Sequence, residues 1–195
     1  SGLVNLGGNA QVLGTKPDGS LWRVAVQSPD AEDEYLGVLE TKDKAIITSG
    51  GYERYFEKDG VTYHHIIDPS TGYPADNGLI SVTIVSADGT LADGLSTSLF
   101  VMGKDKATNY WKAHSDEFDM ILLTDDEKLY VSEGIKDSFT SDREFEIVEK
   151  ILFTITTKAI VMRFKYKSKE EARKNYLKQL EYLKYGIMKQ ERRNA

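Results

Sequence analysis

The fold is decided by residues 80–102, which read ISVTIVSADGTLADGLSTSLFVM. The first part, residues 80–85, alternates in hydrophobicity, which is typical of a strand with one face against a core. A turn signal at Ala87-Asp88-Gly89 follows, and the period of the apolar residues then becomes helical. This change predicts a helix over residues 91–101. The positions that carry the helical period are Leu91, Leu95, Leu99 and Met102.

Short apolar stretches bounded by turn residues lie on both sides of this segment and predict further strands. A second helix is expected over residues 104–113. The order of strands, then helices, then strands favours an α+β fold with a mostly antiparallel sheet and packed helices. The remaining strands are expected at residues 3–6, 21–26, 35–39, 45–48, 61–67, 120–123 and 128–131.

The distribution of charge divides the chain of 195 residues near Lys150. Residues 151–195 contain twelve Lys and Arg but four Glu, whereas the first 150 residues contain 13 basic and 27 acidic side chains. We therefore expect a domain over residues 1–150 and a basic extension over residues 151–195. An acidic body argues against nucleic acid as its ligand. The absence of cysteine excludes a disulfide scaffold, a thiolate metal site and a cysteine nucleophile.

The basic extension has a pattern of its own. Residues 151–164 are β-branched and apolar, which predicts a strand-like segment, and the capping pair Ser168 and Glu171 predicts the start of an amphipathic helix. Three interpretations stay open for this helix: packing on the body or a partner, binding to a membrane surface, or disorder.

Two glycine-containing clusters could bind a ligand. Gly7-Gly8-Asn9 directly follows a strand, where absent side chains let a backbone approach a ligand or turn sharply. Residues 48–54, TSGGYER, combine hydroxyls, backbone N–H groups and an arginine, a set that suits phosphate. Both clusters can equally be plain turns.

Two further clusters carry titratable side chains. His64 and His65 are adjacent on a predicted strand, so at most one of them faces a given site. Asp68 begins a rigid turn and could serve only that turn. Asp93 and Thr97 are four residues apart, on one face of the predicted helix. A carboxylate and a hydroxyl form an oxygen set that suits Mg²⁺; an N-cap and a core contact are the structural alternative.

Taken in order, these motifs resemble the ApbE family, the FAD:protein FMN transferases. The resemblance covers about residues 3–148 and implies a T-fold-like domain that uses Mg²⁺ and FAD. Such an enzyme transfers FMN from FAD to a Thr hydroxyl of an acceptor flavoprotein and releases AMP. The motifs that carry the resemblance are Gly7-Gly8-Asn9, Val12-Leu13-Gly14, Lys16-Pro17-Asp18-Gly19, Thr48-Ser49-Gly50, His65-Ile66-Ile67-Asp68-Pro69 with Thr71-Gly72, and Ala92-Asp93 with Ser96-Thr97.

The resemblance also implies roles for individual residues. Metal ligands are expected at Asp93, Ser96 and Thr97, and His65 is the expected catalytic residue. Contacts to the flavin nucleotide are expected from Gly7, Gly8, Asn9, Ser49, Gly50, His65, Ile66 and Asp68. The family further implies a location in the bacterial cell envelope, anchored on the outer face of the membrane, with any anchor in residues that precede Ser1.

The chain departs from the family pattern in one large respect. It begins on Ser1-Gly2 without Met, carries no signal-peptide pattern, and matches the C-terminal half of the family's domain. We therefore expect a partial chain with little or no FMN transfer by itself. Two alternatives to FMN transfer stay open: a Mg²⁺-dependent FAD pyrophosphatase that yields FMN and AMP, and a fragment that binds a flavin nucleotide without catalysis.

Overall fold

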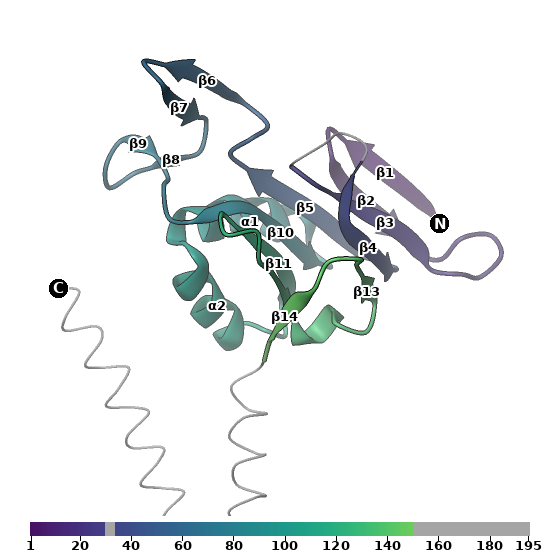
Figure 1. Ribbon diagram of the computed structural model, residues 1–195. Helices are drawn as coiled ribbons and strands as arrows, with labels where there is room; N and C mark the ends of the chain where they lie inside the picture. The colour runs from purple at the N-terminus through teal and green to yellow at the C-terminus, as the bar shows by residue number, and fades with distance from the viewer. Residues whose placement is uncertain (30–33, 150–195) are drawn as a thin grey trace, which may run out of the picture. The chain divides into compact units, whose positions relative to one another are not determined.

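A computed structural model of the chain describes residues 1–29 and 34–149. Residues Ser1–Glu149 form one compact unit, whose centre is a seven-stranded sheet in the order β1-β2-β5-β10-β11-β12-β14 (Figure 1). Every neighbouring pair in this sheet is antiparallel except β12 and β14, which run parallel. The strands are β1 (Gly2–Leu6), β2 (Asn9–Leu13), β5 (Lys44–Gly50), β10 (Leu79–Ser86), β11 (Phe118–Thr124), β12 (Leu129–Ser132) and β14 (Phe145–Val148).

Two helices cover one face of the large sheet: α1 (Gly89–Met102) and α2 (Lys104–Ala113). The Asp88 side chain caps α1 by accepting hydrogen bonds from the N–H groups of Thr90 and Leu91. Apolar side chains of the helices pack against alternate residues of β5, β10 and β11, among them Ile47 and Ile84. This packing fixes α1 beside β5, and that neighbourhood builds the candidate site.

The opposite face of the large sheet packs against a three-stranded sheet in the order β13-β4-β3. The intervening residues of β10 and β11, such as Val85 and Ile121, point to this second core because side chains alternate along a strand. The strands of the small sheet are β3 (Trp22–Gln27), β4 (Tyr35–Thr41) and β13 (Phe139–Thr140), and a 3₁₀ turn spans Glu133–Ile135.

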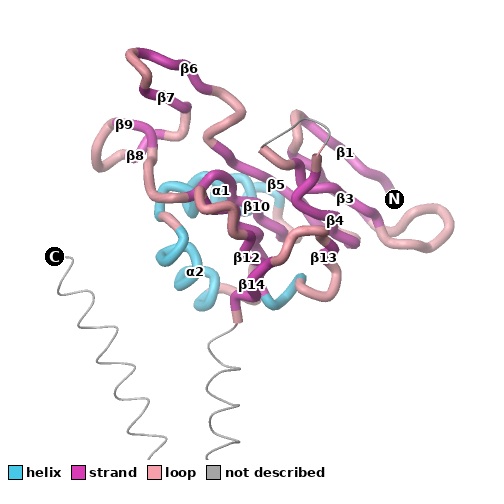
Figure 2. Tube along the Cα trace, viewed as in Figure 1, coloured by secondary structure: helices cyan, strands magenta, loops and turns pink. Residues whose placement is uncertain are grey.

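Two short hairpins lie between β5 and β10 in the sequence, and β6–β7 projects from the body (Figures 1 and 2). The hairpins consist of β6 (Tyr55–Lys58) with β7 (Val61–His64), and of β8 (Ile67–Asp68) with β9 (Tyr73–Pro74). Asp59 and Gly60 form the β6–β7 turn with φ values of 53° and 76°. Two central residues with positive φ are what a tight hairpin of this twist requires.

The α+β class and the mostly antiparallel sheet are confirmed, and the second helix has the predicted bounds. The first helix begins two residues earlier than predicted because Asp88 caps it. The strand predicted over residues 61–67 is broken after His64. The strands β2, β6, β9, β13 and β14 were not predicted. The strand and the amphipathic helix predicted in the basic extension lie outside the described residues.

No helix within residues 1–29 and 34–149 is long and apolar enough to cross a membrane.

Candidate functional site

Three hydroxyl groups from distant parts of the sequence meet on the helical face of the large sheet. Ala45 and Ile47 of β5 point to this face, so Ser49, two residues further along the strand, does the same. Ser49 Oγ lies 2.8 Å from Ser96 Oγ and 3.0 Å from Thr97 Oγ1, both on α1. Ser49, which was predicted to contact the flavin nucleotide, thus contacts Ser96 and Thr97, which were both predicted as metal ligands. We call them the hydroxyl cluster.

Asp93 adds a carboxylate one helical turn before Thr97. Both residues are exposed, and their spacing puts them on the same side of α1. Ser96 differs from them because it is fully buried, and its hydroxyl also donates to the Asp93 carbonyl oxygen at 2.9 Å. Ser96 therefore forms the buried side of the cluster, whereas Asp93 and Thr97 are accessible from solvent.

The oxygen atoms of this group fit a hard divalent cation. Mg²⁺ binds through one or two carboxylates and keeps waters and substrate phosphates as its other ligands. Asp93 supplies one carboxylate, and the hydroxyl cluster supplies neutral oxygens. Across the described residues, no three His, Asp or Glu side chains are grouped to hold a metal ion by themselves. The set is thus suited to a metal that arrives with a phosphate ligand rather than to a closed protein cage.

Two glycines at the end of β5 are required by the rings that pack on them. A Cβ atom on Gly50 would overlap the ring of Tyr52, and one on Gly51 would lie 2.9 Å from His64 Cδ2. Burial, with a smaller contribution from the charge of Glu53, raises the pKa of Tyr52 to about 12. The Tyr52 hydroxyl is therefore protonated at neutral pH. Gly50 was predicted to contact a nucleotide; in the structure it makes room for Tyr52.

His64 is held in one orientation by two hydrogen bonds. Its Nε2 lies 3.1 Å from the Ala75 carbonyl oxygen, which can only accept, and its Nδ1 accepts the Ile66 N–H at 3.2 Å. Its ring also meets Phe100 edge-on, with centroids 5.7 Å apart. These contacts use both ring nitrogens and assign His64 a structural role.

His65 is exposed and has a different partner. Its Nδ1 lies 3.2 Å from the carbonyl oxygen of Arg54, so Nδ1 carries the proton that is donated to this acceptor. In the neutral ring, Nε2 is then the unprotonated atom, as a general base requires. The Arg54 carbonyl therefore sets the tautomer of His65.

Ile66 and Asp68, the next two residues predicted to contact the flavin nucleotide, make contacts within the protein instead. Ile66 is 3% exposed, its N–H binds His64 Nδ1, and its carbonyl accepts from the Ala75 N–H. It thus offers a ligand neither its side chain nor its peptide groups. The Asp68 carboxylate accepts from the hydroxyl and N–H of Ser70, and these hydrogen bonds lower the pKa of Asp68. Asp68 shapes the turn, which is the structural alternative that the sequence left open.

The predicted loop Gly7-Gly8-Asn9 lies elsewhere in the molecule. Gly7 and Gly8 form the two-residue turn between β1 and β2, with φ values of 61° and 94°. Gly8 lines a cavity of about 330 Å³ together with Thr48 and Arg23. Since Thr48 precedes Ser49 in a strand, this cavity lies on the opposite face of the sheet from the hydroxyl cluster. The glycines are explained by the turn, and their contact with a nucleotide stays a prediction.

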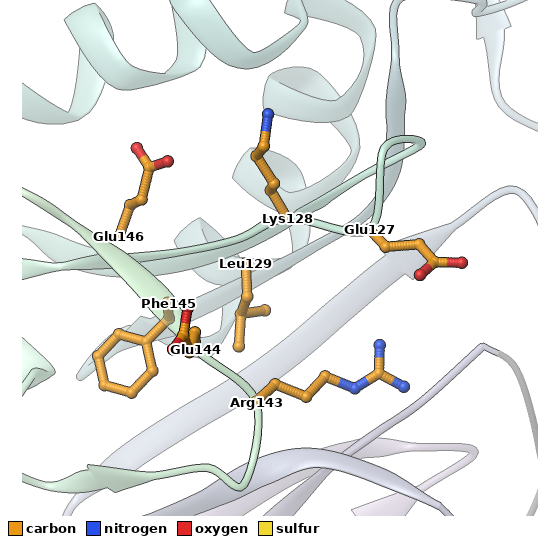
Figure 3. Close-up of a pocket in the computed structure, with 7 residues that line it drawn as sticks. All are labelled: Glu127, Lys128, Leu129, Arg143, Glu144, Phe145 and Glu146. Atoms are coloured by element: carbon orange, nitrogen blue, oxygen red, sulfur yellow. The ribbon is translucent and has the colours of Figure 1, made fainter.

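A cavity of about 580 Å³ lies beside β12 and β14, away from every predicted site residue. Its lining mixes three glutamates with Lys128 and Arg143 (Figure 3).

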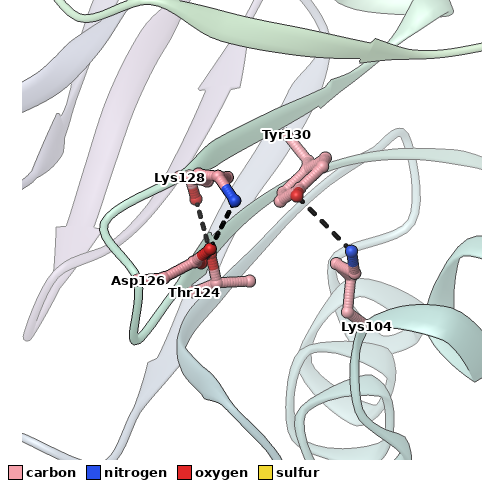
Figure 4. Close-up of polar contacts among 5 residues, drawn as sticks. All are labelled: Lys104, Thr124, Asp126, Lys128 and Tyr130. Atoms are coloured by element: carbon pink, nitrogen blue, oxygen red, sulfur yellow. Dashed lines mark hydrogen bonds and ion pairs between the residues drawn. The ribbon is translucent and has the colours of Figure 1, made fainter.

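The turn between β11 and β12 is held by side-chain hydrogen bonds. Asp126 accepts hydrogen bonds from Lys128 Nζ and from Thr124 Oγ1, each at 2.6 Å (Figure 4). The bond from Lys128 and then that from Thr124 lower the pKa of Asp126. These interactions tie the β11–β12 turn together.

The chain is similar to known proteins in its sequence and in its fold. The model of the ApbE family matches residues 1–122. A protein of Vibrio cholerae named FAD:protein FMN transferase is 41% identical over 136 residues, which cover 69% of this chain and 41% of that protein. The crystal structure of the ApbE protein of Thermotoga maritima is 40% identical with a TM-score of 0.64, and the match covers 73% of this chain and 45% of that one.

The structure titled flavin transferase ApbE from Vibrio cholerae is 35% identical, with a TM-score of 0.59 over 70% of this chain and 43% of that one. The chain thus spans less than half the length of the relatives that it matches. The family match, the identities and the shared fold together show that this chain belongs to the ApbE family.

Proposed function

We propose that the chain carries part of the active site of a Mg²⁺-dependent FAD:protein FMN transferase. The observation that supports this function is the hydroxyl cluster with Asp93 beside it, a group of oxygen ligands at the junction of β5 and α1. The names of the relatives supply the substrate, FAD, and a protein as the acceptor.

In the proposed reaction, a Thr hydroxyl of the acceptor attacks the phosphorus of the FMN half of FAD. A bond forms between this oxygen and phosphorus, the bond from phosphorus to the AMP oxygen breaks, and AMP leaves. The hydroxyl proton moves to a base, because an alcohol is a weak nucleophile at its own pKa. His65 Nε2 is the atom that we assign to this step, since its tautomer is set by the Arg54 carbonyl.

Asp93 and Thr97 are the residues that would hold Mg²⁺, with Ser49 behind them. The ion, when bound, would offset the negative charge of the pyrophosphate and of the leaving AMP. Ser96 keeps Ser49 and α1 in register, because its buried hydroxyl joins Ser49 to the Asp93 carbonyl. In phosphoryl transfer, positioning and electrostatic stabilisation together supply most of the catalysis.

A chimera tests the proposal, because the chain spans less than half of the relatives' length. The aligned 136-residue segment of this chain replaces its counterpart in the Vibrio cholerae transferase. The chimera is incubated with FAD, Mg²⁺ and a protein acceptor of that transferase. We expect flavinylated acceptor and AMP. Free FMN and AMP with unmodified acceptor would identify a pyrophosphatase instead, and no turnover would contradict both activities.

A further inference from the structure

The two faces of the β6–β7 hairpin have different surroundings. The inner face borders a cavity of about 380 Å³ between the hairpin and the body. The residues of the inner face, which alternate along the two strands, are Tyr55, Glu57, Thr62 and His64. The intervening residues form the outer face of the hairpin, and none of them lines that cavity. The residues of the outer face are Arg54, Phe56, Lys58, Val61, Tyr63 and His65.

His65 belongs to the outer face although it follows the last residue of β7. Tyr55 pairs with His64 in the hairpin register. The next N–H, that of His65, donates to the Arg54 carbonyl oxygen at 3.1 Å, so the antiparallel pairing continues by one residue. Because side chains alternate along a strand, His65 points to the same side as Tyr63. The proposed base of the transfer reaction therefore lies on the outer face.

The centre of the outer face is an exposed aromatic stack. The rings of Phe56 and Tyr63 lie with their centroids 5.2 Å apart and their planes within 9° of each other. Phe56 is 61% exposed, and the exposed side chain of Val61 extends the apolar surface toward the turn. Contiguous exposed apolar side chains mark interaction sites, and aromatic residues are enriched at protein interfaces. The stack is therefore a contact surface suited to another protein.

The outer face is also positively charged. Arg54 and Lys58 lie on the two sides of Phe56 along β6, and both are exposed. Neither forms an ion pair with another residue that the structure describes. The six residues of the outer face include no Asp or Glu, and Asp59 lies beyond the face, in the turn. The complementary partner surface is therefore apolar at its centre and acidic at its edges.

The spacing along β7 sets the length of the segment that fits this face. His65 and Val61 are four residues apart, about 13 Å in an extended strand, with Tyr63 midway between them. An extended segment of about five residues spans the same distance and turns every second side chain toward the hairpin. If its first residue lies at His65, its third residue lies at the aromatic stack and its fifth lies near Val61.

We propose that the outer face of the β6–β7 hairpin docks the acceptor protein through an extended segment that carries the acceptor threonine. An apolar side chain of this segment packs on the stack of Phe56 and Tyr63, and acidic side chains lie beside Arg54 and Lys58. The acceptor is the occupant because its hydroxyl must give its proton to His65 Nε2 and so must approach the face on which His65 lies. The inference rests on the proposed function and adds to it the surface that recognises the acceptor.

Steady-state kinetics of the Vibrio cholerae chimera test this inference, with the concentrations of acceptor and FAD varied separately. The outer-face variants are Phe56→Ser and Lys58→Glu, and the matched controls at exposed residues far along the chain are Leu21→Ser and Lys42→Glu. We expect the outer-face variants to raise the KM for the acceptor about 3- to 10-fold, with the KM for FAD unchanged. Added salt should raise the KM for the acceptor more steeply in the unsubstituted chimera than in Lys58→Glu. Circular dichroism and the thermal midpoint verify that each variant is folded.

The outcomes separate the inference from the function on which it rests. If the chimera transfers FMN and either outer-face variant keeps the KM for the acceptor unchanged, the inference is overturned and the proposed function stands. An equal rise in the KM for FAD, or an equal effect in the controls, would also overturn the inference. Self-association of the 195-residue chain that Phe56→Ser abolishes would assign the face to a second copy instead. If the chimera shows no turnover, both the function and the inference are overturned.

Discussion

The substitution Asp93→Asn removes the only carboxylate of the candidate metal site while keeping its shape. The hydroxyl cluster is neutral, so Asp93 carries the whole formal charge that the described site offers to a divalent cation. A charge of −1 about 4 Å from a charge of +2 contributes about 2 kcal/mol in water and about 8 kcal/mol at an effective dielectric constant of 20. Asp93 is exposed, so the lower end of this range applies.

We therefore expect Asp93→Asn to raise the half-saturating Mg²⁺ concentration by at least about 30-fold, the equivalent of about 2 kcal/mol. Thr97→Val should raise it about fivefold, because a neutral oxygen contributes about 1 kcal/mol. The assay is a Mg²⁺ titration of FMN transfer by the Vibrio cholerae chimera. Asp116→Asn, at an exposed loop residue, is the matched control. Wild-type Mg²⁺ dependence in Asp93→Asn would refute the assignment of the site.

Three further predictions concern the residues around the site. His65→Ala should reduce the rate of FMN transfer more than His64→Ala does. His64→Ala should instead lower the free energy of unfolding, measured by urea titration, by about 1–3 kcal/mol, because the two hydrogen bonds of His64 are lost. A larger loss of transfer rate in His64→Ala would void the assignment of His65 as the base. Gly50→Ala should cost about 1–3 kcal/mol of stability because its Cβ overlaps the Tyr52 ring; an unchanged urea midpoint would contradict this packing. The pKa of Tyr52 is raised in the fold, so the protonated Tyr52 hydroxyl contributes its full stabilisation below pH 10 and loses it as the pH rises to about 12. Between these pH values the free energy of unfolding of Tyr52→Phe should fall less than that of the wild type. Parallel curves of unfolding free energy against pH would count against the burial of the hydroxyl.

The central part of the fold could be predicted because its signals are local. The change of period within residues 80–102 marks β10 and α1, and Asp88 supplies the cap that places the start of the helix. The missed strand β6 also had a local signal. Asp59-Gly60 is a typical two-residue hairpin turn, and it implies a partner strand before it as well as after it.

The assembly of the candidate site could not be predicted from such signals. Ser49 meets Ser96 because β5 pairs with β10 in one register, with Thr48 opposite Thr83, and because α1 folds back over β5. A shift of one residue in that register would turn Ser49 to the other face. The sequence likewise suggested one phosphate-binding cluster over residues 48–54, although Thr48 and Ser49 lie on opposite faces of the sheet.

The most direct test of the central claim is the mass of an acceptor protein after incubation with FAD, Mg²⁺ and the chimera. We expect the acceptor to gain one FMN group on a threonine and AMP to appear in equal amount. Chelation of the metal or the substitution Asp93→Ala should abolish both. An acceptor of unchanged mass beside free FMN and AMP would contradict FMN transfer. Transfer at the same rate without Mg²⁺ would contradict the role of Asp93 and the hydroxyl cluster.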